Sequence, residues 1–205
     1  MFTTRENKAD QSGFTLIEAL ITLTVFTIGI IGAFSYALTN MASVRDNYDR
    51  YLATNLAREG LELVKNIRDS NWLKIDANDI CNGQPCTWDY NLAPGYFVVD
   101  YKQTATTPAN ANFENDQKKL YIDPSDNNFY SHTITTQPSN MYRTIQINSI
   151  CLDTTANPPA EYVETTSCSF GRQAIGIQAI AHMRWKRGAK TGQLEISENL
   201  YNWRK

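Results

Sequence analysis

The first part of the chain is dominated by a long apolar run. Between Ala19 and Val44 no side chain carries a charge, and about 26 residues are enough to cross a bilayer as a helix. Charges return after Val44, while apolar residues continue at helical spacing, at Leu52, Leu56, Leu63 and Ile67. Because no proline interrupts residues 14–68, we predict one helix of roughly 80 Å, apolar all round in its first half and amphipathic in its second.

The second part of the chain alternates apolar and polar residues, as β-strands do. Residues 71–95 are rich in Asn, Asp, Gly and Pro and indicate a connecting region. Alternating runs follow at 96–101, 144–148, 175–186 and 194–197. A short segment with two glycines joins the last two runs and predicts a hairpin. We expect an antiparallel sheet whose apolar face packs on the apolar stripe of the helix.

One carboxylate interrupts the start of the apolar run. Glu18 lies inside what would be lipid-facing helix, where an isolated charge costs at least roughly 2.5–3.5 kcal/mol. No Lys, Arg or His lies within reach of Glu18 along the helix. Cleavage after Gly13 would free an α-amine on Phe14, and this amine would place a positive charge at the apolar end of the helix.

Gly13, Phe14 and Glu18, with a short polar leader before them and a long apolar helix after them, resemble the class III signal of type IV pilins and pseudopilins. The resemblance implies that a membrane prepilin peptidase cuts after Gly13 and methylates the new amine of Phe14. It implies that Glu18 pairs with this amine of a neighbouring subunit in a helical filament. It also implies a place below another subunit, because the tip subunit of such filaments tends to lack this Glu.

The leader departs from the pattern of that family in two ways. Its side chains sum to zero charge, where an excess of Lys is usual, and Ser12 stands where a Lys or Arg is common. Neither departure removes the Gly13–Phe14 bond or Glu18.

We therefore expect an α+β, pilin-like fold in which a long N-terminal helix packs on a C-terminal antiparallel β-sheet. The expected parts are a cleaved leader (1–13), a transmembrane and assembly half of the helix (14–42), an amphipathic half (43–70) and a globular extracytoplasmic β domain (71–205). The resemblance implies a single-pass membrane protein that later enters a pilus or pseudopilus. The implied partners are prepilin peptidase, other pilin or pseudopilin subunits, an inner-membrane assembly platform and the lipid bilayer.

Other interpretations of the apolar run explain less of it. A secretory signal peptide has an apolar core of only about 7–15 residues, although Ser35-Tyr36-Ala37 resembles its cleavage site. An uncleaved membrane anchor accounts for the hydrophobicity but not for Gly13 or Glu18. A buried core helix is disfavoured because so long a charge-free run is rare outside membranes.

Neither composition nor motifs point to nucleic acid or to catalysis. The net charge is −2, and the chain has no GxSxG, no HExxH and no phosphate-binding glycine loop. We interpret His132 and His182 as exposed or hydrogen-bonded residues rather than bases or ligands. Residues 184–187, Arg-Trp-Lys-Arg, could contact DNA, but such alternation is ordinary on the solvent face of a strand. We expect no enzyme, no cofactor and no nucleic-acid partner.

Four cysteines lie beyond the apolar run, which fits an oxidising exterior compartment. They allow three pairings, and the sequence leaves all three open. We favour Cys81–Cys86 and Cys151–Cys168, because each pair flanks a segment without strand patterning. A zinc site is the rival interpretation, but Cys81 and Cys86 lack the two-residue spacing and a nearby His.

Residues 123–128, Asp-Pro-Ser-Asp-Asn-Asn, could offer oxygen ligands to calcium. A proline-led Asx turn has the same sequence and needs no metal, so we expect no metal site. The function expected overall is that of a structural subunit, a minor pilin or pseudopilin rather than the main subunit. The alternatives are a single-span membrane protein that carries a binding domain and does not polymerise, and an enzyme whose site has no recognisable motif.

Overall fold

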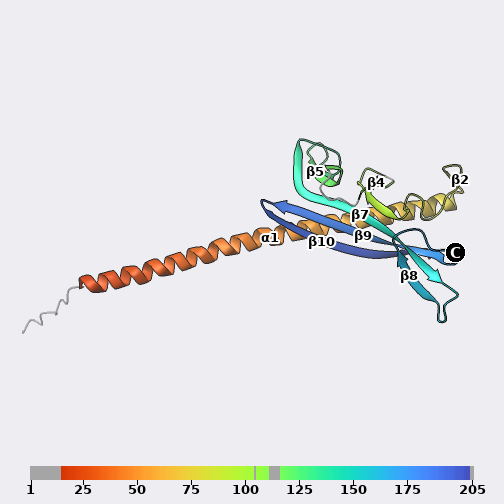
Figure 1. Cartoon of the computed structure of the whole chain (residues 1–205). Coiled ribbons are helices and arrows are strands. Elements are labelled where there is room, and N and C mark those ends of the chain that lie inside the picture. Colours follow the sequence, from red (N-terminus) through yellow and green to blue (C-terminus); the bar gives the residue numbers. More distant parts are fainter. Residues whose placement is uncertain (1–14, 104, 111–115, 204–205) are drawn as a thin grey trace, which may run out of the picture. The chain divides into compact units, whose positions relative to one another are not determined.

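The computed structural model describes residues 15–103, 105–110 and 116–203 (Figure 1). The chain divides into two compact units, Met1–Asn47 and Tyr48–Lys205. One helix, α1 (Leu16–Asp76, 61 residues), runs from the first unit into the second. It is regular through the two glycines of the apolar run, Gly29 and Gly32, where an added Cβ would meet no atom within 4 Å.

The helix continues past its expected end at residue 70 and stops at Asp76. The expectation that residue 71 begins a connecting region was wrong, and the reason is burial. Trp72 is 7% exposed and Asn71 only 1%. The side-chain amide of Asn71 donates to the carbonyl oxygens of Trp88 (3.2 Å) and Tyr90 (2.7 Å), so the extra turns are fixed to the segment that follows them.

α1 ends in a hydrogen-bonded C-capping motif. Asn78 has φ of +54°, the left-handed conformation that Asn tolerates better than most residues. Its N–H donates to the carbonyl of Ile75, and the N–H of Asp79 donates to that of Lys74. These two bonds form the Schellman arrangement that satisfies the last carbonyl groups of a helix.

The second unit contains an antiparallel sheet of eight strands (Figure 1). Its strands are β3 (Gly95–Val98), β4 (Thr107–Ala109), β5 (Lys119–Asp123), β6 (Phe129–Ser131), β7 (Gln137–Asp153), β8 (Ala160–Glu164), β9 (Gln173–Arg187) and β10 (Lys190–Tyr201). The main order is β10-β9-β7-β3-β4, with β5 and β8 also paired to β7 and β6 paired to β5. A 3₁₀ turn, η1 (Asp116–Lys118), precedes β5, and β1 (Ile80–Cys81) pairs with β2 (Gln84–Pro85) as a separate hairpin.

The hairpin expected near the C-terminus is formed by β9 and β10, and β10 is an edge strand of the sheet. β9 and β10 are joined by two residues, with Gly188 at φ of +57°. Trp185 pairs with Gly192 across the two strands, and a Cβ at Gly192 would lie 2.2 Å from the indole ring. Glycine at this position therefore leaves room for the ring, and Trp185 is buried as expected.

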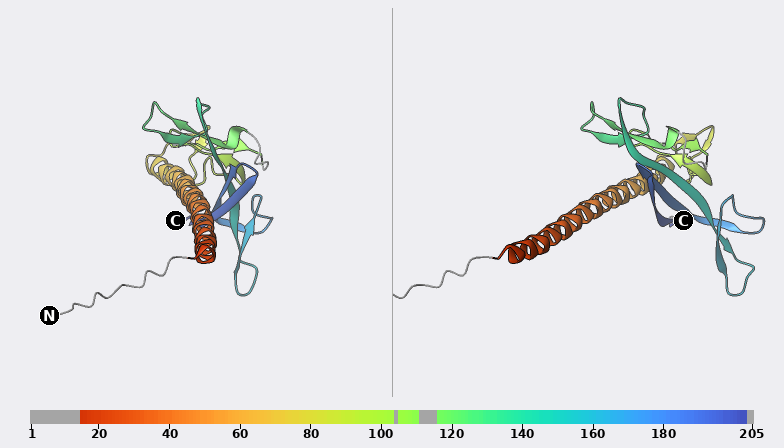
Figure 2. Two further views of the ribbon diagram at one scale, coloured as in Figure 1. Left: turned by 90° about the vertical axis from the view of Figure 1, so that its left-hand side faces the viewer. Right: turned by 60° about the vertical axis from the view of Figure 1, so that its left-hand side comes forward.

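The hydrophobic core of the second unit lies between one face of the sheet and the part of α1 from Tyr48 onward (Figure 2). The expected stripe of the helix supplies one side, with Leu52 and Leu63 at its margins. The α+β layout with a long helix packed on an antiparallel sheet is therefore confirmed. The central residues are Ala53, Leu56, Ala57, Leu61, Val64, Ile67, Ile145, Ile147, Ala179, Ala181 and Met183.

Several strands have no counterpart in the alternating runs of the sequence. β4, β5, β6 and β8 are short, and short edge segments carry little periodicity. The run expected at 96–101 was partly wrong, because β3 ends at Val98 and Tyr101 lies in a turn.

Two disulfides link the cysteines, Cys81 to Cys86 and Cys151 to Cys168, and no described cysteine is free. These are the local pairings that the sequence favoured, but the stated reason was wrong. The first bridge closes the β1–β2 hairpin, and the second encloses β8, so both segments do contain strands. The larger loop, of about 18 residues, contributes roughly 3 kcal/mol in the chain-entropy model.

Candidate membrane and assembly segment

Two of the three residues expected to carry processing and assembly, Gly13 and Phe14, lie outside the residues that the structure describes. The third, Glu18, is exposed in the first turn of α1. Its backbone N–H lies 3.4 Å from Oγ1 of Thr15, which accepts the hydrogen bond. Thr followed three residues later by Glu is the capping-box order. The carboxylate therefore also lies where a negative charge favours a helix N-terminus.

Glu18 takes part in none of the ion pairs formed by the described residues. Glu62 and Asp69, which are exposed on the second half of α1, do have such partners within their own helix. The absence matters because a carboxylate in lipid needs a counter-charge or costs several kcal/mol.

Five side-chain hydroxyl groups of the apolar run are hydrogen-bonded within the helix. Thr22, Thr24, Thr27, Thr39 and Ser43 each donate to a backbone carbonyl three or four residues earlier, at 2.7–3.1 Å. Such bonds remove polar hydrogens from the helix surface. The run is therefore compatible with hydrocarbon although it contains these side chains. A count of charged residues in the sequence does not reveal these hydrogen bonds.

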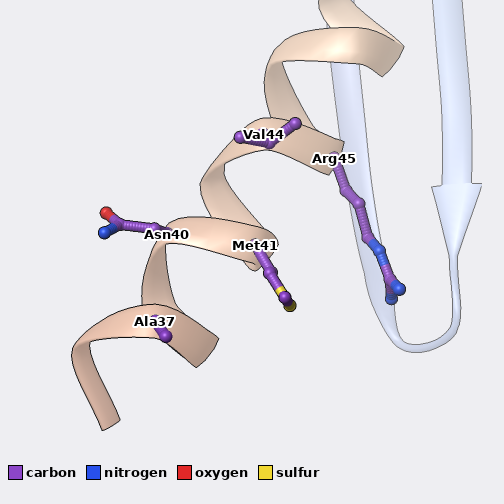
Figure 3. Close-up of a pocket in the computed structure, with 5 residues that line it drawn as sticks. All are labelled: Ala37, Asn40, Met41, Val44 and Arg45. Atoms are coloured by element: carbon purple, nitrogen blue, oxygen red, sulfur yellow. The ribbon is translucent and has the colours of Figure 1, made fainter. Parts of the chain in front are cut away.

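The first unit exposes apolar side chains on every side of its helix. All residues of α1 from Leu16 to Asn47 are exposed, and α1 is the one helix in the described residues that is long and apolar enough to cross a membrane. Figure 3 shows a hollow on this surface, on successive turns of the helix. It is open rather than enclosed, so it belongs to the apolar surface and not to a ligand site. Its lining residues are Ala37, Asn40, Met41, Val44 and Arg45.

A buried arginine connects the sheet to the second half of α1. Arg143 on β7 is fully buried. Its Nη1 donates to the carbonyl of Leu56 (3.0 Å) and to the carboxylate of Glu59 (3.1 Å), and its Nη2 donates to the carbonyl of Val99 (2.9 Å). Arg143 was not predicted from the sequence, although it is in phase with the inward-facing Ile145.

A buried aspartate and histidine lie next to this arginine. Oδ1 of Asp100 accepts a hydrogen bond from the backbone N–H of His132 (2.9 Å) and lies 2.7 Å from its Nδ1. The Nε2 atom of His132 lies 3.3 Å from the carbonyl oxygen of Arg143. Burial alone would raise the pKa of Asp100, but the hydrogen bonds and charge of His132, with the charge of Arg143, outweigh it and hold this pKa below its ordinary value. His132 is thus hydrogen-bonded within the fold.

The second histidine lies on the polar face of the sheet. Nδ1 of His182 is 2.9 Å from the carboxylate of Glu195 on β10, and Nε2 is 3.0 Å from the amide oxygen of Gln146 on β7. Both ring nitrogens therefore have partners, and the histidine lies in a side-chain network across three strands.

At the loop considered for calcium, residues 123–128, a lysine from another segment lies beside two of the carboxylates. Nζ of Lys102 lies 3.4 Å from Asp123 and 3.1 Å from Asp126. The hydroxyl of Tyr101 donates to Asp126 (2.6 Å), and the N–H of Ser125 donates to Asp123 (3.0 Å), as in an Asx turn. Hydrogen bonds to Asp126 and Tyr101 raise the pKa of Lys102. Within the described residues no group of three or more His, Cys, Asp or Glu could hold a metal.

Comparison with known proteins bears on the N-terminal segment alone. Residues 8–34 match a family model described as the prokaryotic N-terminal methylation motif, and this span contains Gly13, Phe14 and Glu18. Comparisons with curated proteins and with solved structures gave no match. The chain carries a type IV pilin-like class III signal, which marks a membrane-anchored precursor that prepilin peptidase processes.

Proposed function

We propose that this chain is a minor pilin or pseudopilin, a structural subunit of a type IV pilus or of a type II secretion-like filament. In this role prepilin peptidase cuts after Gly13 and methylates Phe14, and the subunit assembles through α1. It acts as an assembly component and not as an enzyme. Its partners are other pilin or pseudopilin subunits and an inner-membrane assembly platform, and the sheet domain faces the extracytoplasmic side.

The observation that supports this proposal most strongly is the environment of Glu18. The residue lies within the matched methylation motif, in a helix half whose described side chains are all exposed. A helix apolar on every side needs lipid or other apolar helices around it. A carboxylate in such surroundings needs a cation, and the amine of a processed Phe14 in a neighbouring subunit would supply one.

The capping geometry gives Glu18 a second possible role, and the two roles can be separated. Glutamine also occupies the third helical position of a capping box, so Glu18→Gln keeps a capping side chain and removes the charge. Glu18→Ala removes both. Glu62→Gln is the matched control, because Glu62 is exposed on the second half of the same helix.

We expect Glu18→Gln and Glu18→Ala to be cleaved and inserted like the wild type, since each removes a charge from lipid. Both should be lost from purified filaments, because breaking one side of a buried ion pair costs about 3–5 kcal/mol. Glu62→Gln should assemble normally. Quantification of the chain in sheared filaments decides the matter. If Glu18→Gln assembles like the wild type, the ion-pair role is wrong and capping remains.

A protein that spans the membrane once and does not polymerise is the alternative function. It predicts that even the wild-type chain stays in the membrane fraction under conditions in which filaments form. The same filament preparation therefore separates the two functions.

A further inference from the structure

Asn40 carries the one amide side chain in the charge-free run from Ala19 to Val44. It lies little more than one helical turn before Arg45, where charges return. Its side chain is exposed, and Figure 3 shows the amide extending outward from the helix ribbon. The proposed function gives this amide no role.

Among the described residues, none forms a hydrogen bond with the side chain of Asn40. Its neighbours Thr39 and Ser43 differ, because each hydroxyl donates to a backbone carbonyl one turn earlier, at 3.0 and 3.1 Å. An amide has two N–H donors and an oxygen with two lone pairs, and apolar surroundings penalise such groups when they are unpaired. Asn40 therefore needs a polar partner from outside its own helix.

The surface around Asn40 can accept a second helix. Ala37, Met41 and Val44 line an open hollow together with it (Figure 3), and all three are apolar. By helical spacing, Ala33 lies on the same side of α1. Small side chains let helix backbones approach closely in membranes, and polar side chains then form hydrogen bonds across the interface. This face therefore combines close approach with an unpaired amide.

A second copy of this chain carries the complementary group at the same depth. One sequence sets one orientation in the bilayer, so Asn40 lies at the same level in both copies. Because an amide is both donor and acceptor, two copies related by a two-fold axis can exchange hydrogen bonds through it. A single Asn fixes the register of parallel coiled coils in a similar way. The identical helix thus meets both conditions, depth and chemistry.

The charged residues at the ends of the run leave room for this pairing. Glu18 lies about 33 Å before Asn40 along the helix, so two helices that cross at Asn40 need not bring their Glu18 carboxylates together. Arg45 follows Asn40 by little more than one turn, and its long side chain can reach the water layer. Neither charge has to enter the contact around Asn40.

We infer that α1 forms a parallel, two-fold symmetric dimer in the bilayer, in which Asn40 of one copy hydrogen-bonds to Asn40 of a second copy. The inference rests on the membrane anchoring of the proposed function and does not depend on filament assembly. In this dimer the apolar first half of the helix gains one specific contact, and the rest of its surface faces lipid.

The experiment uses the full chain, with its leader, in phosphatidylcholine vesicles at a series of protein-to-lipid ratios. No described cysteine is free, so Ala189→Cys, at an exposed position, gives one site for a donor or an acceptor fluorophore. Energy transfer between separately labelled copies reports the dimer fraction. Asn40→Leu removes the amide and favours insertion. Thr39→Val is the matched control, because it removes a neighbouring polar group that is already hydrogen-bonded within the helix.

Energy transfer should rise with the protein-to-lipid ratio for the wild type. Asn40→Leu should weaken the dimer between about threefold and thirtyfold, which is the range for hydrogen bonds between membrane helices. Asn40→Gln retains an amide and should lie between the wild type and Asn40→Leu. Thr39→Val should leave the dimerisation constant unchanged.

Cysteine crosslinking tests the face of the helix while Asn40 stays in place. Ala37→Cys and Val44→Cys lie in the hollow beside Asn40, so mild oxidation should link two copies, seen as a dimer on a non-reducing gel. Ala42→Cys, two residues after Asn40, lies on the opposite side of the helix. It should crosslink far less.

Three results would overturn the inference. One is a wild-type chain that stays monomeric at every protein-to-lipid ratio. Another is an Asn40→Leu variant with the wild-type dimerisation constant, which would mean that water or the helix itself satisfies the amide. The third is a crosslinking maximum at Ala42→Cys. Because the vesicles hold no other subunit, loss of the filament role would leave these outcomes unaffected.

Discussion

The two halves of α1 share one continuous backbone but differ in what surrounds them. From Leu16 to Asn47 every side chain is exposed, whereas from Tyr48 to Asp76 one face is buried against the sheet. The first half is apolar all round and the second half is apolar on a stripe. Packing against the sheet of its own domain therefore accounts for the apolar residues of the second half. The described residues do not cover the apolar residues of the first half, and this is the half that carries the methylation motif.

The difference between the two halves indicates what packs against each of them. A stripe of apolar residues is satisfied inside one chain, and the core of the second unit shows this directly. A helix apolar on every side is stable only in lipid or among other apolar helices. Mutations in the second half should therefore alter the stability of the domain, and mutations in the first half should alter insertion and assembly.

The largest effect on domain stability is expected at Arg143. Replacement by Met keeps most of the volume but leaves the carbonyl groups of Leu56 and Val99 without this donor, and it removes the positive charge near Asp100. We expect a loss of about 3–5 kcal/mol in the free energy of unfolding. Urea unfolding of the full chain in detergent, followed by tryptophan fluorescence, measures it. Arg58→Met on the exposed face of α1 is the control, with a change within about 0.5 kcal/mol.

A matched pair of leucine substitutions tests the difference between the halves. Leu56 is 3% exposed and Leu20 is 54% exposed in the same helix. Leu56→Ala should lower the free energy of unfolding by about 2–4 kcal/mol through lost burial and a cavity, while Leu20→Ala should leave it unchanged. Similar losses for both variants in the same urea titration would mean that the first half also packs on the domain, and the comparison would fail.

The smallest expected effect is the response of the second half to pH. Because the folded state holds the pKa of Asp100 below its ordinary value, its contribution to stability is full above about pH 4 and is lost as the pH falls through the folded-state pKa. Asp100→Asn should therefore flatten the acid side of the stability profile measured by unfolding from neutral pH downward. Asp69→Asn, at an exposed position, is the control, and an equal flattening there would contradict the assignment.

The sequence predicted the parts of the fold that rest on long periodic patterns. The helix, the β9–β10 hairpin and the inward Trp185 follow from apolar spacing that extends over many residues. The end of the helix did not, because Asn71 and Asp76 resemble loop residues. It was the burial of Asn71 and the left-handed Asn78 that set the end of the helix.

The buried polar residues were harder to predict. Arg143 has the same phase as Met141, Ile145 and Ile147 on β7, which was a usable signal. Its partners come from two separate parts of the chain, α1 and the residues that follow β3, and no local pattern pairs them. The same holds for His132, whose partner Asp100 lies beyond the end of a strand.

The residues of the candidate site come from local features of the sequence. Gly13, Phe14 and Glu18 were chosen because a cleavage motif and a charge in an apolar run can be read from a few neighbouring residues, and their roles stay predictions. The capping bond between Thr15 and Glu18 was not expected. It follows from the helix beginning at Leu16, and this start is a property of the structure rather than of the motif.

The most direct test of the account is the mass of the N-terminal peptide from the protein purified out of native membranes. The account predicts that the mature chain begins at Phe14 with a methylated amine, because only this cut removes the leader and creates a cation for Glu18. A leader still attached, or a chain that begins near Leu38 as after signal-peptide cleavage, would contradict it.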